Sequence, residues 1–120
     1  RTVWEGDPLG RTVGAAGLLL ALPELHKLGL LYQQGGQWQG KQLLDPNWVR
    51  ESGRKQVENE EDGYGYLFWR GKYDSYRADG LYGQYSVILP AQEAVITCMA
   101  ESRNQKQLLE TLLDAIVPQL

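Results

Sequence analysis

The pair Asp79-Gly80 stands shortly before the β-forming run 84–89, with a second glycine at Gly83 between them. An Asp-Gly pair flanked by β-forming residues predicts a tight hairpin turn, so this stretch indicates two antiparallel strands. The turn would also hold backbone N–H groups at an exposed strand end, where they can donate to a ligand or to a developing oxyanion. No other part of the chain gives a comparable signal for chemistry.

Further strand-like stretches surround this hairpin and are joined by short connections, which predicts an antiparallel meander. The four expected strands cover residues 64–70, 73–79, 84–89 and 94–100. The last two are apolar on both faces, so both sides of the sheet should be covered. A closing helix over 103–117, with an apolar stripe from Leu108 to Val117, would provide one cover.

Two helices are expected before the strands. Leucines recur at helical spacing over 22–34 and the pattern ends at Gly35-Gly36, while Asp45-Pro46 is typical of the start of a short second helix. For the closing helix, Ser102 and Gln105 have the spacing of a capping box, and Pro118 marks the end.

The expected fold class is therefore α+β, with a meander of three to four strands, an N-terminal helix pair and a C-terminal helix packed on the sheet. We interpret the chain as one segment, 1–120, in four parts. They are a helical part (1–53), an exposed polar loop (54–62), antiparallel strands (63–101) and the closing helix (102–120).

Composition excludes several classes of function. The formal net charge of -3 gives no basic field for nucleic acid, and the longest apolar run, 18–22, is far too short for a membrane helix. A single cysteine and a single histidine allow neither an internal disulfide nor a His/Cys zinc site, and no cofactor is expected. Cys98 is interpreted as a small buried hydrophobe. No signal peptide is visible in this segment, which favours a cytoplasmic location, and the absence of an initial Met indicates a piece of a longer protein.

Short matches to catalytic motifs are interpreted as structural. Ser52 and Lys55 fit Ser-x-x-Lys, but Gly53 interrupts the helix and charged residues flank the pair, so Lys55 should remain solvated and protonated. Ser102-Arg103-Asn104 is explained by a helix cap. His26 lies beside a helical apolar stripe, with no Gly-x-Ser-x-Gly nucleophile turn in the chain.

The order of several weak motifs resembles the C-terminal part of the β-lactamase-related serine hydrolases. This superfamily comprises class C β-lactamases, DD-peptidases and β-lactamase-fold esterases. The resemblance covers nearly the whole chain and is carried by residues 7–10, 14–18, 25–32, 35–41, 48–49, 63–66 and 79–84 and by Pro90.

The resemblance implies where a substrate would bind. The family's Lys-Thr-Gly, His-Thr-Gly or Trp-Gly-Gly strand element matches Ala78, Asp79 and Gly80, and the N–H of Leu81 would then be an oxyanion-hole donor beside Tyr82. Asp79 replaces a hydroxyl residue or glycine. An acidic wall would disfavour carboxylate-bearing substrates such as penicillins, so an esterase-like or amidase-like parent that cleaves small esters or amides is expected.

The family's Ser-x-x-Lys helix and Tyr-x-Asn element would precede everything in this chain, and no Tyr-x-Asn occurs in it. We therefore expect no catalytic residue here and no activity for the chain alone. The expected partner is the missing N-terminal part of the domain. Otherwise the chain would associate with itself through the strand edge 94–100 or an uncovered sheet face.

A second interpretation is a non-catalytic binding module. Four tryptophans and seven tyrosines would then line an aromatic-rich sheet that holds a peptide or a glycan, although core packing alone also explains such rings.

Overall fold

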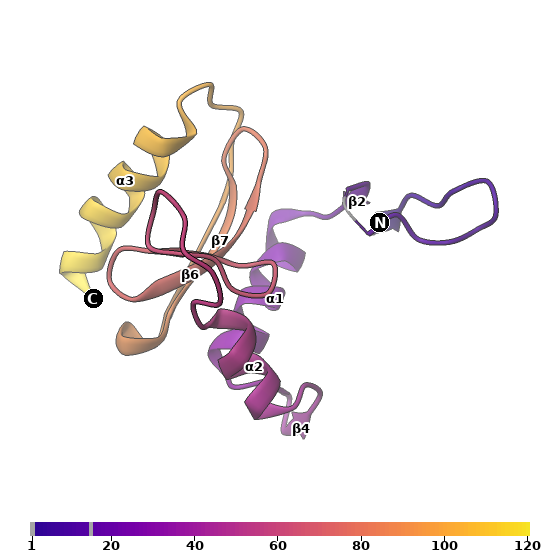
Figure 1. Cartoon of the computed structure of the whole chain (residues 1–120), viewed down its shortest axis with the longest axis horizontal. Helices are drawn as coiled ribbons and strands as arrows, with labels where there is room; N and C mark the ends of the chain where they lie inside the picture. The colour runs from indigo at the N-terminus through magenta and orange to yellow at the C-terminus, as the bar shows by residue number, and fades with distance from the viewer. Residues whose placement is uncertain (1, 15) are drawn as a thin grey trace.

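The computed structural model describes residues 2–14 and 16–120, and its centre is a four-stranded antiparallel sheet (Figure 1). The strands run in the order β5-β6-β7-β8, a meander in which each strand pairs with its neighbour in sequence. They are β5 (Trp69–Gly71), β6 (Ser75–Gly80), β7 (Gln84–Leu89) and β8 (Ala94–Met99). The predicted α+β class and meander are confirmed.

Two helices cover opposite faces of the sheet, α1 (Leu22–Gln33) and α3 (Gln105–Ile116), as Figure 1 shows. Side chains alternate between the faces of a strand, so Tyr85, Val87 and Leu89 of β7 pack with Leu113 and Val117 on the side of α3. The opposite face, with Ile88, forms a second cluster with Phe68 and Tyr76. The cover expected on both faces is present, so the suggested association through an uncovered sheet face is wrong over β7 and β8.

Helix α1 approaches the sheet closely because residue 29 is glycine. A Cβ built at Gly29 would lie 2.4 Å from the Ser86 hydroxyl oxygen and 2.6 Å from Cγ1 of Val95. His26, one turn earlier, holds the same helix to β8 through a 2.8 Å contact between Nδ1 and the Thr97 hydroxyl. His26 is thus engaged in a helix-to-sheet contact, in line with its structural interpretation.

The second helix, α2 (Pro46–Gly53), begins as predicted, with the Asp45 carboxylate accepting from the Asn47 N–H at 2.7 Å. Helix α3 begins differently. Its cap is Asn104, whose side chain accepts from the Gln107 N–H at 3.2 Å, so the predicted capping box at Ser102 and Gln105 is wrong. Ser102 instead accepts from the Asn104 N–H, one turn before the helix.

The strand predicted over 64–70 is also shorter than expected. Regular pairing covers only Trp69–Gly71, and Tyr64 forms isolated bridges to Val57 and Trp69. The backbone conformation between Tyr64 and Trp69 explains why the strand is short. Gly65 lies against α2, where a Cβ would be 2.2 Å from the Ser52 carbonyl oxygen, and Leu67 adopts φ +65°, so the segment turns back instead of extending.

Small hairpins flank α1. Strands β1 (Val3–Trp4) and β2 (Leu18–Leu19) pair in an arm that projects away from the sheet, and β3 (Gln37–Trp38) pairs with β4 (Lys41–Gln42) after α1 (Figure 1). The arm contains the predicted turn at residues 7–10, where the Gly10 N–H donates to the Asp7 carbonyl. Positions 1 and 15 of the Gly-rich segment expected over 1–16 lie outside the described residues. No helix in the described ranges has the length and apolar character that a membrane crossing requires.

Candidate functional site

The predicted wall residues Ala78, Asp79 and Gly80 are the last three residues of β6 and pair with β7. Strand β5 pairs with β6 only as far as Arg77, opposite Trp69. Beyond Arg77, the side of β6 that faces β5 therefore has no strand partner among residues 2–14 and 16–120. A strand edge left open in this way can offer backbone groups to a ligand.

The hairpin turn lies two residues later than predicted. Gly80 is still paired with Gln84, and the loop is Leu81, Tyr82 and Gly83, the last two with φ of +66° and +96°. A three-residue hairpin loop ending in a left-handed glycine explains why Gly83, rather than the Asp-Gly pair, closes the turn. A Cβ at Gly80 would make a tight contact with the Gln84 side chain, at 3.0 Å.

The loop itself is exposed but anchored. The carbonyls of Tyr82 and Gly83 accept from the N–H groups of Ser102 and Ala100 at 2.8 and 3.1 Å, whereas the Leu81 N–H donates to no group in the described part of the chain. The Leu81 residue is 65% exposed. The Leu81 N–H, on a loop held by these two bonds, therefore has no acceptor among the described residues.

Beside this strand end lies a partly buried ion cluster centred on the buried Arg77. The Arg77 Nε donates to Asp79 at 2.8 Å, one terminal nitrogen donates to Glu61 at 3.1 Å, and the other donates to the Arg70 carbonyl at 3.1 Å. Burying a guanidinium is costly unless its donors are satisfied, and all three nitrogens here have a partner. The cluster joins the loop 54–62 to the sheet, so this loop is anchored and is not simply solvated.

Two adjoining cavities open around the cluster. One, of about 330 Å³, is lined by Asp79, Gly80 and Leu81 together with Glu61, Trp69, Arg77 and Gln105. The other, of about 380 Å³, shares Glu61, Arg77, Asp79 and Gln105 with the first and extends along α3 to Leu113. The structure therefore brings three of the five predicted wall residues to a cavity. Ala78 packs partly against the core cluster of Phe68, Tyr76 and Ile88, and Tyr82 is in the exposed loop.

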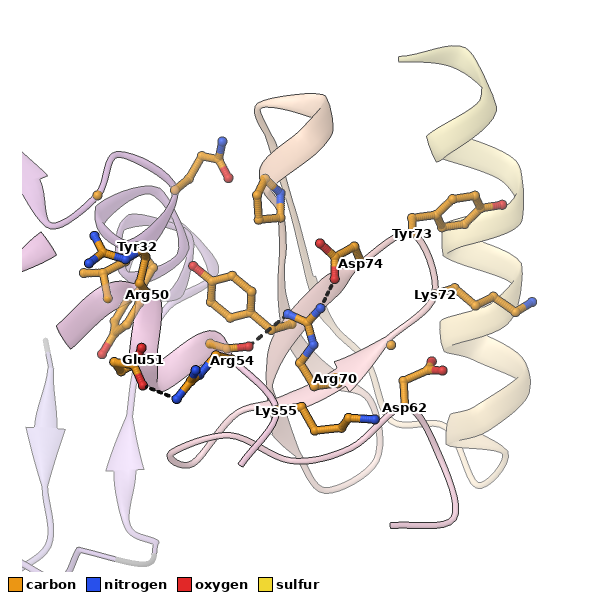
Figure 2. A pocket seen from close by; sticks show the side chains of 17 residues that line it. Tyr32, Arg50, Glu51, Arg54, Lys55, Asp62, Arg70, Lys72, Tyr73 and Asp74 are labelled. Carbon is orange, nitrogen blue, oxygen red and sulfur yellow. Dashed lines mark hydrogen bonds and ion pairs between the residues drawn. The ribbon is translucent and has the colours of Figure 1, made fainter. Parts of the chain in front are cut away.

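A larger cavity, of about 910 Å³, lies between the end of α1, α2 and the β5–β6 turn and contains none of residues 78–82 (Figure 2). Two pairs of its charged side chains are engaged with each other, whereas the buried Oε1 of Gln33 has no hydrogen-bond partner among the described residues. Arg70 donates to the Gly53 carbonyl at 2.9 Å and pairs with Asp74, while Arg54 pairs with Glu51 at 2.7 Å, as Figure 2 shows. We favour the smaller cavities because one of them is bordered by three of the predicted wall residues, Asp79, Gly80 and Leu81.

Two tyrosines of the core have altered acidity. Burial raises the pKa of Tyr76 to about 12, with a smaller contribution from neighbouring Tyr32. Burial, and then the charge of Asp79, raises the pKa of Tyr85, whose hydroxyl donates to the Gln105 carbonyl at 2.9 Å. Both phenols therefore stay protonated at neutral pH, and neither can act as a general base there.

The positions of Ser52 and Lys55 agree with the structural interpretation of their Ser-x-x-Lys match. Ser52 is fully buried near the end of α2 and donates to the Val49 carbonyl at 3.1 Å, while Lys55, beyond the helix, pairs with Glu58 at 2.9 Å. Cys98 packs against the apolar cluster under α3. Within the described residues, no three His, Cys, Asp or Glu side chains gather closely enough to hold a metal ion.

Sequence inspection missed Glu61 and Arg77 as members of the site. Arg77 stood in the hairpin segment and Glu61 in the charged loop, 16 residues apart. Their only available signal was a basic residue inside a strand pattern, where a lone charge requires a partner from elsewhere.

Comparison with known proteins supports the architecture. No protein-family model matches the chain, and no curated protein matches it. Among solved structures, a protein from Bacillus anthracis named "Putative 6-aminohexanoate-dimer hydrolase" superposes with a TM-score of 0.75 at 19% identity. The match covers 95% of this chain and 32% of that protein, so this chain spans about a third of its length. The fold described above is consistent with a partial β-lactamase-like fold.

Proposed function

We propose that this chain forms the C-terminal part of a β-lactamase-fold serine hydrolase that cleaves a small ester or amide through an acyl-enzyme. The nucleophile and base would lie on a part of the protein outside this sequence. The open end of β6 would then be one wall of the reaction cleft, and the chain alone would be inactive. The observation that carries this proposal is the coincidence of a hydrolase-like partial fold with an unengaged Leu81 amide at a cavity.

The role of the wall follows from its backbone. When a nucleophile attacks a carbonyl, negative charge develops on the carbonyl oxygen, and a rigid N–H donor stabilises that charge more than it stabilises the substrate. The bonds that hold its loop to residues 100 and 102 support this role for the Leu81 N–H. A side chain at Gly80 would make a tight contact with Gln84 of β7, at 3.0 Å.

The decisive experiment removes this donor in the protein that includes the upstream polypeptide. Leu81→Pro deletes the N–H and should lower kcat about a hundred- to a thousandfold with little change in KM. Leu81→Ala keeps the N–H and is the matched control, with kcat within about threefold of the parent. Equal activity of the two variants on an activated ester would contradict the proposed donor.

The chain alone provides a second test. Incubation with a fluorescent penicillin and with an activated ester should leave it unlabelled, since Ser52 is buried and donates to Val49. Labelling at Ser52 would contradict the proposal that the nucleophile lies elsewhere. A Ser-x-x-Lys at the start of an apolar helix, followed by Tyr-x-Asn, in the coding sequence upstream would support it.

One observation favours the alternative of a non-catalytic binding module. Trp48 of α2 and Tyr66 stack on the surface with ring centroids 5.6 Å apart, and both remain partly exposed. The rings of Tyr76 and Tyr85 on the sheet and of Phe68 beside it are buried in the core, so an exposed aromatic surface would lie at Trp48 and Tyr66 rather than on the sheet. A start codon directly before Arg1 and binding of a glycan or peptide that is lost in Trp48→Ala would support this alternative.

A further inference from the structure

We infer that the large cavity between α1, α2 and the β5–β6 turn binds small aromatic carboxylates, with Arg50 and Tyr76 as donors to the carboxylate group. This cavity contains none of residues 78–82. The inference therefore does not depend on the proposed hydrolase function, and an experiment can contradict either one while leaving the other intact.

The first argument is a hydroxyl group without a partner on a buried side chain. Tyr76 is only 6% exposed and borders the cavity, and its hydroxyl shares no hydrogen bond with any described residue. The unpaired hydroxyl of Ser86 is sealed from solvent, whereas that of Tyr76 keeps accessible surface. Polar groups of buried side chains normally have a partner, so this protonated phenol calls for an acceptor that comes from the cavity.

The second argument is the position of this hydroxyl on α2. A Cβ built at Gly53 would lie 3.0 Å from Cζ of Tyr76, the atom that carries the hydroxyl. Glycine at this position therefore leaves the space that the phenol occupies. Arg50 lies three residues earlier, on the same face of the helix, and also borders the cavity. Figure 2 shows Arg50 at the end of the cavity formed by α1 and α2.

The third argument is that Arg50 is available to an anion. Its guanidinium donates to the neutral side chain of Asn47, and no described carboxylate pairs with it. A guanidinium can hold a carboxylate through two parallel N–H donors. The other basic residues of the wall all have a carboxylate partner, and they are Arg54, Lys55, Arg70 and Lys72.

The net charge of the wall points the same way. Five basic and three acidic side chains line this cavity, although the whole chain has a formal net charge of -3. Gln33, at the end of α1, adds a further donor, because no described residue accepts from its side-chain Nε2. An anion is therefore favoured over a cation in this cavity.

The walls and the size of the cavity suit a ligand with a flat ring. Tyr32 and Tyr76 both border it, and each packs edge to face against Phe68, with ring centroids 4.7 and 5.3 Å apart. These contacts hold the two phenol rings in place, and Val49 adds an apolar surface. Aromatic walls favour an aromatic ligand through stacked or edge-to-face contacts. The volume of about 910 Å³ is at the upper end of the range for small-molecule sites.

The test is a titration of the 120-residue chain with benzoate, benzamide and inorganic phosphate, followed by backbone amide NMR shifts. Benzamide keeps the shape of benzoate without its charge, and phosphate keeps a charge without a ring. We expect saturable shifts with benzoate at Arg50, Gly53 and Tyr76 that are weakened by salt, and binding at least about tenfold weaker for the other two probes. Equal binding of benzamide or phosphate, or no saturable shift with benzoate, would overturn the inference.

Variants assign the two donors. Arg50→Gln removes the charge of an exposed side chain and should weaken benzoate binding about tenfold, whereas Tyr76→Phe removes only the hydroxyl and should weaken it about fivefold. Arg103→Gln, which removes an exposed charge outside the cavity, is the matched control and should leave binding unchanged. Full affinity in Arg50→Gln would refute the site even if Tyr76→Phe failed to fold. Full affinity in a folded Tyr76→Phe protein would refute the role of the hydroxyl.

Discussion

At the scale of single residues, Arg77 shows how one side chain can organise a site. It reaches Asp79 two residues along its own strand, the Arg70 carbonyl on β5 and Glu61 in the loop before the sheet. The local sequence predicted the strand that carries Arg77. It could not predict the pairing with Glu61, because a contact between a strand and an irregular loop leaves no periodic signal in either segment.

Replacing Arg77 should destabilise the fold more than any exposed ion pair would. Arg77→Met leaves two carboxylates without their partner in a partly buried place, so we expect the free energy of unfolding to fall by about 2–3 kcal/mol. Urea unfolding measures this. Arg54→Met, which breaks an exposed pair with Glu51, should cost about 0.5 kcal/mol or less, and similar losses in the two variants would show that the cluster adds no stability.

The buried phenol of Tyr76 should make stability depend on alkaline pH. Its pKa is about 12 in the folded state, above the ordinary value of 10.0 for a phenol in water. A group whose pKa is raised by folding contributes fully below the unfolded value and loses that contribution as pH rises toward the folded value. Between these two values, the free energy of unfolding should fall by up to about 1.4 kcal/mol per pH unit from this group.

Urea unfolding at pH 9, 10 and 11 measures the effect, with Tyr76→Phe as the comparison. The variant lacks the ionisable hydroxyl and should lose less stability across this window than the parent. Identical slopes in the two proteins would contradict the role assigned to Tyr76.

At the scale of elements, helices and the last two strands followed directly from the sequence. Leucine spacing gave α1 and α3 to within a few residues, and the apolar run gave β7 with its bounds unchanged. The errors lie where the backbone leaves regular conformations. The β6–β7 turn formed at Gly83 because pairing extends through Gly80, and the strand at 64–70 was cut short by the close approach of Gly65 to α2.

The close packing of α1 on the sheet at Gly29 gives a prediction at this scale. Gly29→Ala adds a methyl group within 2.4 Å of the Ser86 oxygen and 2.6 Å of Val95, so the helix must move outward. Alanine favours a helix by about 1 kcal/mol over glycine, but overpacking typically costs 1–3 kcal/mol, and we expect a net loss of about 1 kcal/mol.

Thermal and urea unfolding check this result. The exposed Lys27→Ala on the same helix is the matched control and should change stability by no more than about 0.5 kcal/mol. A Gly29→Ala protein more stable than the parent would mean that α1 does not rest on Ser86 and Val95 in solution.

At the scale of the whole molecule, the sheet is open at β8. This strand pairs with β7 on one side, and no described residue pairs with its other side. The helices on both faces leave the backbone edge as the route for association, in agreement with the expected edge at 94–100. In the proposed intact protein, a strand from the missing part would occupy this edge.

For the chain alone, we expect self-association at micromolar concentration through the β8 edge, measured by sedimentation velocity. Met99→Lys places a charge at the exposed end of this strand and should shift the particle toward the monomer. Leu9→Lys, on the projecting arm, is the control for added charge. A strictly monomeric parent, or equal association in the two variants, would contradict the edge as the contact.

The hydrogen bond from the Tyr85 hydroxyl to the Gln105 carbonyl connects β7 to the first residue of α3. Gln105 also borders both small cavities. A ligand in either cavity would thus contact the junction between α3 and the sheet. Ligand binding in these cavities should therefore change how often the first turn of α3 unfolds. Amide exchange in this turn would then report whether a ligand is bound.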